Sequence, residues 1–125
     1  MTRRELVTRR LSGEELRQEL AGTLDLMRDA GIAACGIAFG FAWAFEYYAD
    51  DSWEAESIQL ERVWEKIEEL ETRGLGRFGD DDIVISIQGM ELRFCHESDV
   101  HLTVHDRSEL AETIELGWQQ RGLLA

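Results

Sequence analysis

The chain of 125 residues contains no proline and only one lysine. Slow prolyl isomerisation therefore cannot limit its folding, and its turns must come from Gly, Asp and Ser residues. Its two cysteines, Cys35 and Cys95, are far apart in the sequence and belong to no CxxC motif. This spacing argues against a disulfide framework and favours a reduced, cytoplasmic protein.

Long apolar segments are also missing. The longest run without a charged residue, 31–45, has 15 residues, fewer than the roughly 20 that a membrane-spanning helix needs. The start of the chain lacks the apolar stretch of a signal peptide, so we expect no export and no membrane partner. The motifs GxGxxG, GxSxG, HExxH and the P-loop are absent, so no catalytic motif indicates an enzyme.

Negative charge dominates the composition of the chain. Thirteen basic residues face 26 acidic ones, which gives a net charge of −13. The first ten residues carry +3, so the rest of the chain carries −16. A surface this negative repels nucleic-acid phosphates and attracts basic partners, so we expect no nucleic-acid binding. Solubility alone, or adaptation to a salty cytoplasm, is the alternative explanation for the acidity.

The hydrophobic pattern predicts a single α+β domain over residues 12–125. A basic segment, 1–11, precedes it as an arm or as an extension of the first helix. We expect the order α-β-α-β-β-β-α, with an antiparallel sheet built from one aromatic-rich strand and a three-stranded meander. Three amphipathic helices are expected to cover the apolar face of this sheet.

Three segments carry helical spacing together with capping signals. The first begins at Ser12, an N-cap with a glutamate three positions later, and ends at Gly31. The second is expected to begin at Asp51 and to end near Gly74. The third is expected to begin at Asp106, again with a glutamate at the third position.

Alternation with a period of two predicts the strands. Residues 36–48 alternate large apolar side chains with Gly, Ala and Glu, which is typical of a strand with one aromatic face. For the meander, we expect a two-residue turn at 89–90 and a three-residue connection at 97–99. This register places Cys95 opposite His101 on the outer face of the sheet.

The segment 95–106 holds all three histidines and one of the two cysteines. Cys95 and His101 are the candidate ligands of a zinc site, or the candidate pair of a thiol enzyme. His105 lies four residues further along the strand, about 13 Å away at roughly 3.3 Å per residue, which is too far to share an ion. A structural hairpin with surface histidines is the alternative, and we expect no cofactor other than zinc.

A row of glutamates lies along the predicted second helix. Like charges at i, i+4 and i+8 destabilise an isolated helix by roughly a few tenths of a kcal/mol per pair. We interpret the row as a docking surface for a cationic partner. A solvated helix face, neutralised in part by Arg62 and Lys66, is the alternative. The candidate partner-binding residues are Glu54, Glu61, Glu65, Glu68 and Glu69.

Three functions remain open, and no motif ties the chain to a family. The first, which we favour, is a small acidic interaction protein that binds a basic protein, in the manner of inhibitor or immunity proteins. The second is a small metal-binding protein or enzyme centred on Cys95 and His101. The third is a homo-oligomeric structural module, for example a homodimer, whose copies pack through the outer face of the sheet or the small residues of 38–44. We expect a binding protein rather than an enzyme.

Overall fold

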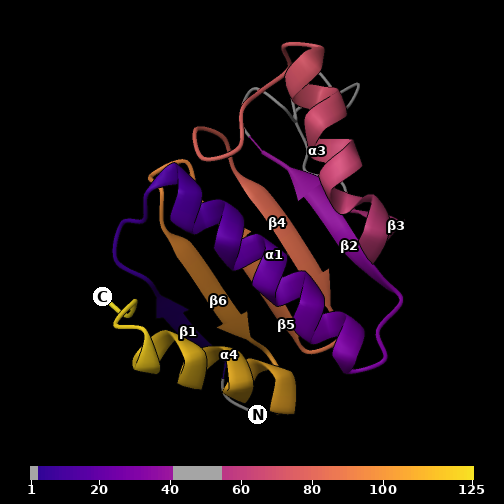
Figure 1. Ribbon diagram of the computed structural model, residues 1–125. Coiled ribbons are helices and arrows are strands. Elements are labelled where there is room, and N and C mark those ends of the chain that lie inside the picture. The colour runs from indigo at the N-terminus through magenta and orange to yellow at the C-terminus, as the bar shows by residue number, and fades with distance from the viewer. Residues whose placement is uncertain (1–2, 41–54) are drawn as a thin grey trace.

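The computed structural model of the protein describes residues 3–40 and 55–125. Within these residues, six strands form one antiparallel sheet, and α1 and α4 lie across one of its faces (Figure 1). The strand order is β1-β6-β5-β4-β2-β3, so β1 and β3 form the two edges. In chain order the elements are β1 (Arg4–Val7), α1 (Gly13–Asp29), β2 (Ala34–Phe39), β3 (Glu56–Gln59), a 3-10 turn (Leu60–Arg62), α3 (Val63–Thr72), β4 (Ile83–Ile87), β5 (Met90–Phe94), β6 (Val100–Val104) and α4 (Glu109–Gln120).

The protein is α+β with an antiparallel sheet and three α-helices in the described residues, but the expected four-stranded sheet is wrong. Residues 4–7, expected in a basic arm or a helix extension, form β1 and pair with β6. Residues 56–59, expected inside the second helix, form β3 and pair with β2. Each of these strands has only four residues, too few for a period of two to be distinguished from helical spacing.

The first helix begins and ends where the sequence predicts. The hydroxyl of Ser12 accepts a hydrogen bond from the Glu15 N–H, and the Glu15 carboxylate accepts one from the Ser12 N–H, so the capping box is confirmed. Gly31 follows the helix with a φ of +83°, a left-handed conformation that glycine adopts without steric cost.

The other two helices begin later than predicted. The expected start at Asp51 lies outside the described residues, and β3 occupies part of the expected helix, although α3 does end before Gly74 as predicted. For α4, the N-cap is Ser108 rather than Asp106, because the Ser108 hydroxyl accepts a hydrogen bond from the N–H of Ala111.

Alternation in the strands divides the sheet into two faces. One face packs against the helices in a single hydrophobic core, to which Leu20 of α1, Ile67 of α3 and Trp118 of α4 contribute fully buried side chains. The intervening strand residues point to the opposite face, here called the outer face. The strand residues in the core include Ile37, Phe39, Ile83, Ile85, Met90, Leu92, Phe94, Val100 and Leu102. The predicted aromatic strand is described only as far as β2 and Gly40, and the rest of it lies outside the described residues.

The turn between β4 and β5 lies one residue earlier than predicted. It consists of Gln88 and Gly89, so Ile87 pairs with Met90. Gly89 has a φ of +87°, and this left-handed position fixes where the chain turns. Because the pairing shifts by two residues, each side chain keeps its predicted face.

The connection between β5 and β6 also lies one residue earlier than predicted. It is a three-residue loop that ends at Ser98, which has a φ of +67°. The N–H of Cys95 donates to the Asp99 carbonyl at 2.9 Å and closes the loop. Arg93, rather than Cys95, therefore lies opposite His101, and the predicted cross-strand pair is wrong.

A buried carboxylate joins α1 to α4. Glu19 is only 4% exposed, and its two oxygens accept hydrogen bonds from the indole Nε1 of Trp118 at 2.5 Å and from Nη1 of Arg121 at 2.9 Å. Trp118 is fully buried, so its N–H depends on this carboxylate for a partner.

Removing this carboxylate should destabilise the fold. We expect Glu19→Ala to lower the free energy of unfolding by roughly 2 to 4 kcal/mol, because a buried indole N–H is left unpaired. Glu19→Gln should cost less, since the amide oxygen can still accept from the indole. Denaturant unfolding followed by circular dichroism measures both. The control is Glu112→Ala on the exposed face of α4, expected within roughly 0.5 kcal/mol of the wild type; equal costs for Glu19→Ala and Glu112→Ala would contradict the assignment.

Candidate functional site

Side chains that can bind a metal or exchange protons gather at one end of the sheet. At this end β5 finishes, while β4 and β6 begin, because neighbouring antiparallel strands run in opposite directions. Two groups of three residues each bring their ligand atoms within 4.8 Å of one another, and both groups include Cys95. We call them the His96 triad (Asp82, Cys95 and His96) and the His101 triad (Cys95, Asp99 and His101).

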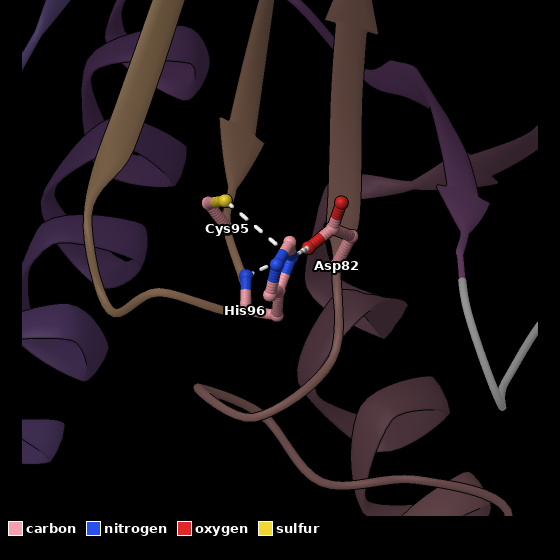
Figure 2. A group of neighbouring side chains, drawn as sticks. All are labelled: Asp82, Cys95 and His96. Carbon is pink, nitrogen blue, oxygen red and sulfur yellow. Dashed lines mark hydrogen bonds and ion pairs between the residues drawn. The ribbon is translucent and has the colours of Figure 1, made fainter.

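In the His96 triad, Asp82 holds the loop that follows β5. Asp82 is 2% exposed, and its Oδ1 accepts hydrogen bonds from the backbone N–H of His96 at 2.6 Å and from the His96 ring at 2.7 Å (Figure 2). The ring nitrogen in this contact is Nδ1, which must carry a proton to bond to a carboxylate. The hydrogen bond to Asp82 is the main cause that raises the pKa of His96 above the ordinary histidine value.

The thiol of Cys95 approaches the same ring nitrogen of His96. Its Sγ is 3.6 Å from Nδ1 of His96, the nitrogen that already donates its proton to Asp82 (Figure 2). That nitrogen therefore cannot take the thiol proton as a general base would. Burial is the main cause that raises the pKa of Cys95, and the charges of Asp82 and Asp99 raise it further, against a backbone hydrogen bond from Glu97 that lowers it. The arrangement does not favour a thiolate nucleophile at neutral pH.

In the His101 triad, the imidazole lies between two carboxylates. Its Nε2 is 3.2 Å from Oδ1 of Asp99, and its Nδ1 is 3.7 Å from Oε1 of Glu5 on β1. The structure thus brings the predicted ligands Cys95 and His101 together without pairing them across the strands. His105, which follows β6, belongs to neither triad among the described residues.

Sequence reasoning missed the two carboxylates of these triads. Asp99 stands in the loop between the two predicted ligands, so its place beside them could have been inferred once the loop was located. Asp82 precedes β4 and meets His96 only through the pairing of β4 with β5. No local signal connects residues so far apart along the chain.

Four of the five predicted partner-binding glutamates lie on one exposed surface, while Glu54 lies outside the described residues. Two of the four make long ion pairs along the helix, Glu65 with Arg62 at 3.6 Å and Glu69 with Arg73 at 3.7 Å. All four side chains in these pairs are more than half exposed. The glutamates of this surface, here called the α3 acidic row, are Glu61, Glu65, Glu68 and Glu69.

A shallow hollow of about 200 Å³ separates α3 from the edge strand β3. Acidic and basic side chains both line it, and Lys66 pairs with Glu56 across it at 3.5 Å. The α3 acidic row is therefore partly neutralised within this hollow and negative on its outward side.

None of the helices in residues 3–40 and 55–125 is long and apolar enough to cross a membrane. Comparison of the chain with protein-family models, with curated proteins and with solved structures finds no match. The function must therefore be inferred from the residues themselves.

Both thiols should react slowly in the folded protein. Burial raises the pKa of Cys35 to about 11, and the pKa of Cys95 is also raised. A disulfide reagent at neutral pH should therefore label the native chain much more slowly than the denatured chain. The Cys35→Ser variant isolates Cys95, and rapid labelling of this variant in its native state would show an activated thiol instead.

Asp82→Asn should lower the pKa of His96, because the carboxylate that favours the imidazolium is lost. A raised pKa in the folded state means that the ion pair stabilises the fold below the ordinary histidine pKa of 6.5, and that this stabilisation is lost as the pH rises through the raised value. The difference in stability between the wild type and the variant should therefore be larger in mild acid than in mild alkali. NMR titration of the histidine rings, with His96→Gln for assignment, gives the pKa directly; an unchanged His96 titration in Asp82→Asn is the contrary result.

Proposed function

We propose that this chain is a small acidic interaction protein of the cytoplasm that binds a basic protein partner, as inhibitor and immunity proteins do. The observation that supports this most directly is the α3 acidic row, a set of exposed glutamates beside the edge strand β3. The net charge of −13 gives the protein as a whole the same sign. The two free cysteines are consistent with a reducing compartment.

The acidic row is held on a rigid support. Val63, Ile67 and Leu70 point from the opposite side of α3 into the core and are fully buried. The helix backbone that carries the row is therefore held in place, and complementary charge on such a surface speeds association and selects the partner.

The internal ion pairs of the row are easy to replace. Exposed pairs such as Glu65 with Arg62 contribute roughly 0 to 1 kcal/mol each. Arginine or lysine side chains of a partner can therefore displace Arg62 and Arg73 from these glutamates at small cost.

Neutralising the row should weaken partner binding. The partner is first captured from lysate at low salt with the wild-type chain, purified and identified. We then expect Glu61, Glu65, Glu68 and Glu69 changed together to Gln to slow its association by about tenfold or more, and we expect added salt to slow the wild-type chain in the same way. Surface plasmon resonance at two ionic strengths measures both effects.

A control with the same change in net charge separates the row from the overall acidity. It carries Gln or Asn at four exposed acids of other helix faces, namely Glu14, Asp25, Asp29 and Glu112. If this control slows association as much as the row variant does, the row has no special part. If binding proves indifferent to salt, or if the captured partner is itself acidic, the proposal fails.

A further inference from the structure

The end of the sheet that carries both triads brings several potential metal ligands close together. Cys95 and the four side chains around its thiol, those of Asp82, His96, Asp99 and His101, carry metal-binding atoms. They supply one sulfur, imidazole nitrogens and carboxylate oxygens, which is the donor set that Zn²⁺ prefers and that Ca²⁺ and Mg²⁺ do not.

Within the His96 triad, the groups already satisfy one another. Oδ1 of Asp82 accepts from both the backbone and the ring of His96, at 2.6 and 2.7 Å. A metal on Nδ1 of His96 would have to break the hydrogen bond between this nitrogen and Asp82 and displace the carboxylate. The His96 triad is therefore better explained as the support that fixes the loop after β5.

A metal in the His101 triad would replace a weaker contact. The hydrogen bond between Nε2 of His101 and Oδ1 of Asp99 is 3.2 Å long, against 2.7 Å for the bond between His96 and Asp82. Two ligands at about 2.0 to 2.1 Å from a tetrahedral zinc are about 3.3 Å apart, and Nε2 of His101 is 3.2 Å from Oδ1 of Asp99. The Sγ of Cys95 lies within 4.8 Å of both atoms. The hydrogen bond from the Cys95 N–H to the Asp99 carbonyl holds these two residues side by side at the base of the loop.

The other nitrogen of His101 lies near a carboxylate, the kind of group that metal-binding histidines often use as an outer partner. Its Nδ1 is 3.7 Å from Oε1 of Glu5, on the neighbouring strand β1. This distance is too long for a hydrogen bond, but a small shift of the half-exposed Glu5 side chain would let Nδ1 donate to it and orient Nε2 toward the metal.

We propose that Cys95, Asp99 and His101 bind one Zn²⁺ ion, with water in the fourth position. Binding deprotonates the Cys95 thiol and the proton passes to solvent, so the thiolate and the Asp99 carboxylate together match the charge of the ion. The His101 side chain is 28% exposed, which leaves access for the water. Three protein ligands with one open position are typical of zinc sites that act on a ligand rather than of closed structural sites.

Zinc binding to the full chain tests this proposal. After treatment with a chelator and dialysis, ZnCl₂ should bind at one ion per chain by calorimetry and by metal analysis. Co²⁺, used as a probe, should give a thiolate charge-transfer band. We expect Cys95→Ser and His101→Ala each to weaken Zn²⁺ binding by more than about 100-fold, and Glu5→Gln to weaken it by about tenfold, as loss of an outer carboxylate does.

Histidine and carboxylate controls decide where the ion lies. His105→Ala, an exposed histidine after β6, should leave the affinity within about threefold. His96→Ala, which removes a support of the loop but no ligand, should weaken binding less than His101→Ala does. Circular dichroism checks that each variant folds, and Asp99→Asn supplies a conservative ligand variant that keeps the shape of the loop.

Two results would overturn the proposal. One is the absence of stoichiometric zinc or of the thiolate band in the wild-type chain. The other is loss of binding in His96→Ala or Asp82→Asn while His101→Ala still binds, because the ion would then lie in the His96 triad.

Discussion

The alternation of apolar and polar side chains in the central strands determines how the helices and the candidate site are placed. Every second side chain of β4, β5 and β6 is a large apolar residue, so one face of this sheet has to be covered, and α1, α3 and α4 contribute to the single core on that face. Apart from Val84, the intervening positions of these strands carry polar or ionisable residues on the outer face. Since β5 ends where β4 and β6 begin, the residues at these strand ends meet, and both triads form there.

Acidic residues have two different uses in this fold. Glu19 and Asp82 are buried, and each is balanced by N–H donors: Trp118 and Arg121 for the first, His96 for the second. A buried carboxylate is tolerable only with such donors, so these two acids fix the position of α4 on α1 and of the loop after β5. The ion pairs that the structure describes for the α3 acidic row are those of Glu65 and Glu69, and both are long and exposed. The charge of the row therefore remains directed at the solvent.

The parts of the fold that the sequence predicts are those with local causes. The capping box of Ser12 and the division of the meander into two faces depend on residues within a few positions of one another, and both are as expected. The turn positions are wrong by one residue because they depend on which residue adopts a positive φ, and Ser98 gives no sequence signal for doing so. Four-residue edge strands give too little periodicity to detect. The sequence indicates Cys95 and His101 by composition, whereas Asp82 joins the site only through strand pairing.

The acidic row and the proposed zinc site are spatially and electrostatically separate. In the sheet order, β4 and β2 stand between β5, which leads into the zinc ligands, and β3, which borders the row. Binding of Zn²⁺ with loss of one thiol proton changes the net charge by only +1, which is small against −13. The electrostatic attraction of a basic partner is therefore nearly the same with and without the ion, and any dependence of partner binding on zinc would have to arise from direct contact at the outer face rather than from the field of the protein.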